Sequence, residues 1–353
     1  MKGNTTRRAI GALVTASAVV AFAATSASAD PGEYRPLTGT GSDTTQYVMG
    51  ALGEAITIGG DKVIGSYYAV GSATIQTRED GVVFNRPNGS GNGLRALTAS
   101  INPDGDNTWP VSGGIEIEDQ LDFARSSSGP GVEGTDLTFI PFAADAVSYA
   151  YSDYGDASVP TGLTLDDLAD IYKGDVTTYL DKNGVTRTYI PRLPQTGSGT
   201  RNFFLSSIGL TDADVSWIGD LVQENDGSQI DAIGELVPFS VASWIAQNNR
   251  VVPNTIAGNI VGLGAIDDDF LGVVPPVRFA ALNPAFPVDR LVYNVVETSR
   301  LSGTSAEDVL LQDTFKGASS EVCQASAVIT TYGFGTIPNC GDTTTYKSGY
   351  VRT

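Results

Sequence analysis

The stretch "QTGSGTRNFF" at residues 195–204 sets two glycines around a serine, followed by a threonine and an arginine, directly before an apolar helical pattern. Backbone N–H groups at the start of a helix lack partners, and the helix dipole places partial positive charge there. Glycine lets the backbone approach an anion closely, and hydroxyl groups add hydrogen-bond donors. The stretch therefore suits an oxyanion site, a catalytic serine or a simple turn.

The chain contains no histidine and two cysteines. The lack of histidine excludes a Ser-His-Asp triad, a histidine general base and every zinc site that includes histidine. Two cysteines cannot form an all-thiolate zinc site, and the stretch lacks the G-x-S-x-G spacing of a nucleophile elbow. We therefore expect a non-enzymatic protein without a metal site or cofactor. A phosphate-ester hydrolase that uses Ser198 or Thr200 as nucleophile is the alternative.

The N-terminus has the pattern of an export signal. A basic start at residues 1–8 precedes an apolar run at 9–24, and "ASA" at 27–29 predicts cleavage after Ala29. No cysteine follows that could carry a lipid anchor, and no later run is long enough for a membrane helix. We expect a secreted protein, and an oxidising compartment favours a disulfide between Cys323 and Cys340.

The mature chain would keep 18 basic and 40 acidic residues, because the leader carries three of the 21 basic ones. The resulting net charge of −22 repels nucleic acid and anionic lipid. Any anion that binds must therefore be held by a local concentration of donors.

Strand and helix patterns alternate along the chain. We expect strands at 62–70, 145–152 and 290–297 and helices at 93–101, 164–174 and 304–317. Thr164 with Asp167, and Thr304 with Glu307, have the spacing of helix-capping pairs. The alternation predicts an α/β fold with helices on both faces of the sheets.

Four loops place glycine or small hydroxyl residues before a helical pattern, at 38–52, 86–97, 122–131 and 195–205. A capping role explains any one of them, and Asp43 with Gln46 forms a good capping pair. Four such loops in one chain favour a shared anion site.

These loops and a segment at 224–249 resemble the phosphate-type substrate-binding proteins of ABC transporters, over residues 37–296. The motifs are "LTGTGSDTT", "NGSGNG", "DFARSSS", "YKGDVTTY" and "GSGTRNFF". The resemblance implies a type II periplasmic-binding-protein fold, with two α/β lobes of mixed sheets flanked by helices and a ligand cleft between them. Residues 30–142 and 284–353 would form lobe 1, and residues 143–283 lobe 2, after a signal peptide at 1–29.

The resemblance also implies ligand-binding residues in each loop, and we add the neighbouring Arg125 and Ser126. The full set is Asp43, Thr44, Ser90, Arg125, Ser126, Ser127, Ser198, Gly199 and Thr200. The family has an aspartate where this chain has Ser127, and its arginine falls at Pro194. Our hypothesis is that Asp43 and Arg125 take over these two roles.

The sequence thus predicts a secreted, monomeric solute-binding protein that holds a small tetrahedral oxyanion, with phosphate as the first candidate. An ABC permease is the candidate partner. An extracellular cell-wall or adhesion protein that keeps the fold without an oxyanion is a further alternative.

Overall fold

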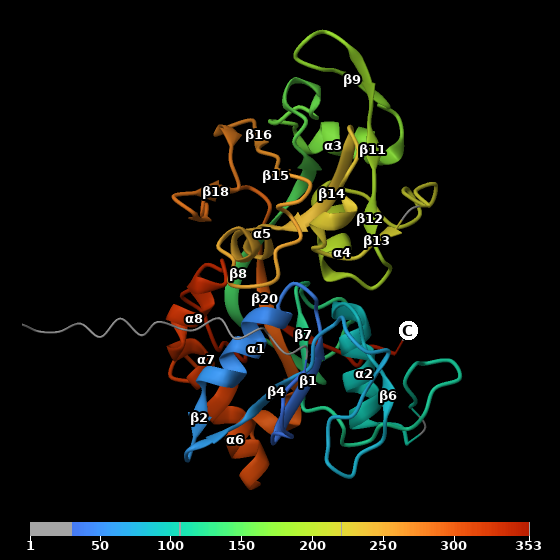
Figure 1. Cartoon of the computed structure of the whole chain (residues 1–353). Helices are drawn as coiled ribbons and strands as arrows, with labels where there is room; N and C mark the ends of the chain where they lie inside the picture. Colours follow the sequence, from blue (N-terminus) through green and yellow to red (C-terminus); the bar gives the residue numbers. More distant parts are fainter. Residues whose placement is uncertain (1–29, 106, 220, 353) are drawn as a thin grey trace, which may run out of the picture.

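The computed structural model describes residues 30–352 except 106 and 220, so the predicted leader at 1–29 lies outside the described residues. Two lobes lie one above the other and share a mixed sheet with the strand order β11-β14-β8-β20-β7-β1-β4 (Figure 1). The strands are β11 (Ile190–Pro191), β14 (Glu235–Ser240), β8 (Leu137–Ser152), β20 (Asp289–Glu297), β7 (Phe123–Ser126), β1 (Leu37–Gly41) and β4 (Ile64–Ser66). β15 (Val261–Leu263) and β21 (Lys347–Ser348) also pair with β8.

The antiparallel strands β8 and β20 run through the junction between the lobes (Figure 1). Along β8, residues up to Ala143 belong to the hydrophobic cores of the lower lobe, together with α1 and α2. Residues from Ala146 onward belong to the cores of the upper lobe, together with α3 and α4. The sheet is therefore continuous while the apolar interior is divided, which fits the predicted two-lobed α/β class.

Eight helices are seen in the described residues, and they cover both faces of the sheet. They are α1 (Gln46–Ala55), α2 (Ser90–Ile101), α3 (Leu165–Lys173), α4 (Gly199–Ser207), α5 (Val241–Asn248), α6 (Ala306–Phe315), α7 (Glu321–Gln324) and α8 (Ser326–Thr331).

Outside the main sheet, the lobes contain short two-stranded sheets, of which one is parallel and the others are antiparallel. They are β2 (Thr57–Ile58) with β3 (Asp61–Lys62), β5 (Thr74–Ile75) with β6 (Phe84–Asn85), β9 (Thr178–Leu180) with β10 (Thr186–Thr188), β12 (Leu193–Pro194) with β13 (Leu221–Val222), β16 (Ile266–Asp268) with β17 (Gly272–Val274), and β18 (Val277–Arg278) with β19 (Ala281–Leu282).

Several local predictions are confirmed. Thr164 and Asp167 form the capping box of α3, and Gly174 ends it in the left-handed conformation at φ 86°. The strand expected at 290–297 is β20, and the one at 145–152 is the second half of β8. Cys323 and Cys340 form a disulfide. In the described part of the chain, no helix is both long enough and apolar enough to span a bilayer.

Other local predictions were wrong. The N-cap of α6 is Ser305, which accepts a hydrogen bond from the N–H of Asp308, so the capping pair lies one residue after the predicted Thr304 and Glu307. The strand expected at 62–70 is broken into two short pieces. The helix expected at 93–101 is confirmed as part of α2, which begins earlier, at Ser90.

The loop at 122–131 does not precede a helix, because β7 leads into a bend and the next element is β8. Gly129, Pro130 and Gly131 follow it, and these residue types favour turns over helix. The first loop does precede a helix, but Asp43 does not cap it. The N-cap of α1 is Thr45, and Asp43 accepts a side-chain hydrogen bond from Gln46 instead.

Candidate functional site

Three serine hydroxyls from separate segments of lobe 1 meet at the junction of the lobes. Ser42 follows β1, Ser90 begins α2 and Ser127 follows β7. Ser42 Oγ donates to Ser127 Oγ over 3.1 Å, Ser90 and Ser127 share a hydrogen bond of 3.2 Å, and the Ser127 N–H donates to Ser90 Oγ over 3.0 Å. All three side chains are buried. We call these residues, together with Thr44, Gly199 and Thr200, the hydroxyl cluster.

Lobe 2 contributes the start of α4 to the hydroxyl cluster. A Cβ at Gly199 would lie 2.3 Å from Ser90 Oγ and 2.4 Å from Ser127 Oγ, so only glycine allows this approach. Nearby, the N–H of Gly91 donates to the carbonyl of Gly197 over 3.0 Å and links the two lobes. The starts of α2 and α4 therefore face each other across the junction, and each adds the partial positive charge of a helix N-terminus.

The threonines of the hydroxyl cluster also join the lobes. The hydroxyl oxygens of Thr44, before α1, and Thr200, in the first turn of α4, lie 3.1 Å apart. Both then donate to Glu224 Oε1, over 2.8 Å and 2.6 Å. Glu224 is only 2% exposed, and its Oε2 accepts no hydrogen bond from any described residue. The Glu224 carboxylate thus accepts hydrogen bonds from two hydroxyls that could otherwise bind an oxyanion from solution.

Arg290, at the start of β20, is a cation that contacts side-chain hydroxyls of the cluster. Its Nη2 donates to Thr200 Oγ1 over 2.9 Å and to Thr44 Oγ1 over 3.3 Å, and its Nη1 donates to the carbonyl of Ser127 over 3.0 Å. Nε and Nη2 also contact Asp145 Oδ2 in a buried ion pair of 2.8 Å. The guanidinium therefore holds both lobes together and places positive charge beside the hydroxyls.

The predicted pair of Asp43 and Arg125 lies close to the hydroxyl cluster but turns away from it. Arg125 is buried and donates to the carbonyls of Tyr67 and Ser42 over 2.6 Å and 3.2 Å and to Ser66 Oγ over 3.0 Å. Burial lowers the pKa of Arg125 to about 9. Its Nη2 has no hydrogen-bond partner among the described residues. The guanidinium thus organises lobe 1.

Asp43 faces the other lobe. It accepts hydrogen bonds from Gln46 over 2.8 Å, from Asn225 over 3.0 Å and from Gln223 over 3.4 Å. Burial first, and then the charge of Glu224, raise the pKa of Asp43 to about 8, although the amide donors lower it.

The remaining predicted residues divide into two groups. Thr44, Ser90, Ser127, Gly199 and Thr200 come together in the hydroxyl cluster. Ser198 is the N-cap of α4 and accepts from the N–H of Arg201, while Ser126 donates to the carbonyl of Ser128 within its own loop.

Sequence reasoning missed Ser42, Arg290 and Glu224. Ser42 lies inside the quoted motif "LTGTGSDTT" but was not selected. The signal for Arg290 is a single arginine at the start of a mostly apolar strand, "RLVYNVV". Glu224 opens the family-like segment at 224–249, although nothing in its neighbours marks it as buried.

The fold resembles solved structures of phosphate-binding proteins. A protein from Clostridium perfringens, described as a phosphate ABC transporter substrate-binding protein and solved with bound phosphate, matches with a TM-score of 0.56 at 16% identity, over 85% of this chain and 99% of that chain. An ABC-type phosphate transport receptor from Vibrio cholerae matches with a TM-score of 0.53 at 17% identity, over 85% of this chain and 100% of that chain. These matches confirm the two-lobed fold class.

A scan against models of known protein families and a search of curated proteins find no match. At the identities above, the structural likeness shows the fold alone. The ligand must therefore be argued from the side chains of this chain.

Proposed function

We propose that this chain is an exported solute-binding protein that holds phosphate between its two lobes. The observation that carries the proposal is the meeting of hydroxyls from both lobes with the guanidinium of Arg290 and the starts of α2 and α4. Hydrogen bonds to an ionised group contribute about 1.5–3 kcal/mol each. A micromolar dissociation constant corresponds to a binding free energy of about −8 kcal/mol. Several such hydrogen bonds can supply this even after the entropic cost of immobilising the ligand and the side chains.

The predicted Thr44, Ser90, Ser127, Gly199 and Thr200 form the proposed site, and Arg290 takes the role of the cation. In the structure the serines satisfy one another, so an entering oxyanion would replace these contacts. Arg125, Ser126, Ser198 and Asp43 stay predictions as direct ligands, since their hydrogen bonds run elsewhere.

Two adjacent serines provide a matched test of the site. Ser127→Ala removes a hydroxyl of the cluster, whereas Ser126→Ala removes one that bonds within its own loop. Titration calorimetry with phosphate should show a loss of about 10- to 100-fold for Ser127→Ala, because a hydrogen bond to a charged ligand is removed. Ser126→Ala should bind as the wild type does. The proposal would be refuted if phosphate does not bind the wild type, or if both variants bind phosphate as tightly as the wild type does.

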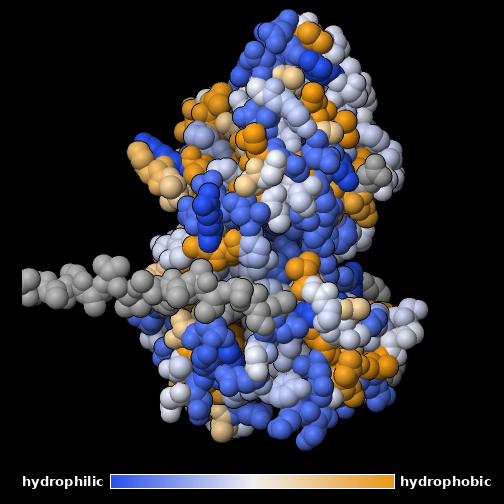
Figure 2. All heavy atoms as spheres, viewed as in Figure 1, coloured by the Kyte–Doolittle hydropathy of each residue, from blue (hydrophilic) through white to orange (hydrophobic). Residues whose placement is uncertain are grey.

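Export and transport are further parts of the proposal. If the leader is cleaved after Ala29, the mass of the secreted protein should correspond to a chain that begins at Asp30. If the protein serves an ABC permease, loss of its gene should slow phosphate uptake at limiting phosphate. Much of the face seen in Figure 2 is hydrophilic, as expected for a surface that is exposed to water.

A further inference from the structure

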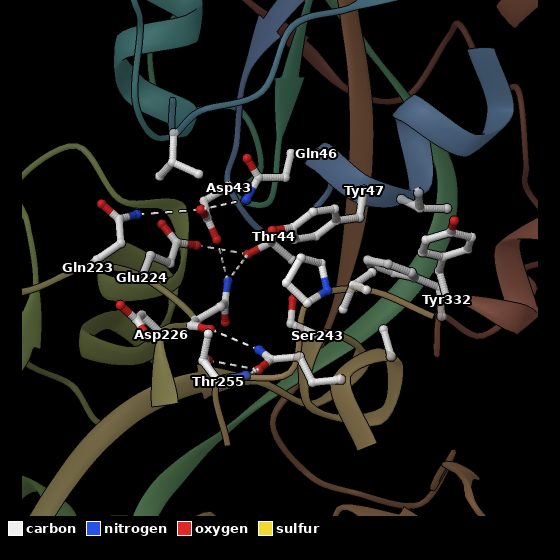
Figure 3. A pocket seen from close by; sticks show the side chains of 18 residues that line it. Asp43, Thr44, Gln46, Tyr47, Gln223, Glu224, Asp226, Ser243, Thr255 and Tyr332 are labelled. Atoms are coloured by element: carbon white, nitrogen blue, oxygen red, sulfur yellow. Dashed lines mark hydrogen bonds between the residues drawn. The ribbon is translucent and has the colours of Figure 1, made fainter. Parts of the chain in front are cut away.

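A second feature at the lobe junction is a pocket of about 260 Å³ beside the hydroxyl cluster (Figure 3). It shares Thr44 with the hydroxyl cluster and is also lined by Glu224, which accepts a hydrogen bond from Thr44, so a ligand could contact both the cluster and the pocket. A water molecule takes about 30 Å³ in the liquid, so the pocket holds the volume of about eight waters. A substituent of several heavy atoms would fit there beside an oxyanion in the cluster.

The charge of the pocket is opposite to what a bare anion needs. Asp43, Glu224 and Asp226 line it, and none of its 18 lining residues is lysine or arginine. Asp226 is already satisfied, because its oxygens accept from Ser228 and Gln229. Among the buried side-chain atoms of the described residues that line the pocket, the one without a hydrogen-bond partner is Glu224 Oε2, on a side chain 2% exposed. A buried carboxylate oxygen without a partner is costly, and a donor that carries positive charge is its best complement.

Aromatic rings border the same pocket. Tyr47 on α1 and Tyr332 after α8 both line it, and Figure 3 shows both side chains at its edge. The faces of such rings attract ammonium groups. The carboxylates of Glu224 and Asp226 and the two tyrosines thus favour a cation over a neutral hydroxyl group.

We propose that the natural ligand is an aminoalkyl phosphate, whose phosphate lies in the hydroxyl cluster and whose ammonium group lies in the adjoining pocket. This inference rests on the proposed function and narrows its ligand class. Burial and the charge of Glu224 raise the pKa of Asp43 to about 8, and an ammonium group in the pocket would lower that pKa by favouring the ionised form.

The test compares three ligands by calorimetry on the wild-type protein: inorganic phosphate, O-phosphoethanolamine and glycerol 3-phosphate. We expect O-phosphoethanolamine to bind at least ten times more tightly than phosphate, and glycerol 3-phosphate to gain nothing over phosphate. In Glu224→Gln the ratio of the two affinities should fall toward one. Asp231→Asn, which removes an exposed carboxylate outside the pocket, should keep the ratio.

The outcomes separate the two proposals. If phosphate binds and O-phosphoethanolamine binds no better, or glycerol 3-phosphate gains equally, the aminoalkyl phosphate is refuted and the phosphate site stands. If neither phosphate nor O-phosphoethanolamine binds, both proposals fail. If Glu224→Gln keeps the wild-type ratio, the assignment of the pocket is refuted. Circular dichroism checks the fold of this variant, and the wild-type comparison decides the ligand class even if the variant does not fold.

Discussion

Adding one methyl group at Gly199 should prevent the lobes from closing. A Cβ there would lie 2.3 Å and 2.4 Å from the hydroxyl oxygens of Ser90 and Ser127, about 1 Å short of an ordinary contact. Ser90 cannot rotate away freely, because its Oγ accepts from the N–H of Ser127. Overpacking of this kind costs about 1–3 kcal/mol. Gly199→Ala should therefore weaken phosphate binding by about 5- to 150-fold.

Folding itself should not suffer, because alanine favours helix over glycine at the start of α4. The matched control is Gly91→Ala, also in the first turn of a helix at the junction, where a Cβ would meet its nearest neighbours at an acceptable 3.4 Å. Calorimetry measures the affinity, and small-angle X-ray scattering measures the separation of the lobes. If Gly199→Ala binds phosphate as tightly as Gly91→Ala and keeps the same radius of gyration, the described closure is wrong.

Three further predictions concern stability. Asp145→Asn leaves the buried guanidinium of Arg290 without its counter-ion, so urea denaturation should show a loss of about 3–5 kcal/mol, and a loss below about 1 kcal/mol would contradict the ion pair. The pKa of Asp43 rises from 3.8 to about 8 on folding, so between these pH values the folded chain holds a proton that the unfolded chain releases. The free energy of unfolding should therefore fall as the pH is raised from about 4 to about 8. Asp43→Asn should flatten that fall, and an unchanged pH slope in urea denaturation would refute the assignment. Replacing Cys323 and Cys340 by serine should lower the free energy of unfolding by about 3 kcal/mol, the value of the chain-entropy model for a loop of 17 residues. Phosphate affinity should stay unchanged, and a loss of binding would contradict a purely stabilising role of the disulfide.

Local chemistry made much of the fold predictable. The capping box at Thr164 and the following helix depend on residues within one turn of each other, so spacing alone locates them. The error at α6 has the same origin, since Thr304 and Ser305 are both good caps and tertiary packing selects between them. The loop at 195–205 was located correctly because glycine and serine before an apolar pattern mark a helix start.

The cation and the carboxylate of the site could not be predicted in this way. Arg290 reaches Thr200 and Thr44 across sequence separations of 90 and 246 residues, and long-range strand pairing of β20 with both β8 and β7 helps to bring them together. Arg125 misled the sequence reasoning because it stands two residues from Ser127. Residues two apart on a strand point to the same side, so Arg125 was expected beside the Ser127 hydroxyl. Its guanidinium instead donates hydrogen bonds to backbone carbonyls of lobe 1.

The charges at the lobe junction limit which anions the site can hold. Arg290 is already paired with Asp145, and Glu224 adds a second buried carboxylate that forms no ion pair with any described residue. A fully ionised oxyanion beside Glu224 would place two like charges together at low dielectric, which is strongly unfavourable. A hydrogen phosphate avoids this because it can donate its own proton to Glu224, and an ammonium group on the ligand can compensate Glu224 directly. Sulfate has neither a proton at neutral pH nor an ammonium group, so the same charges that admit phosphate or an aminoalkyl phosphate should exclude sulfate.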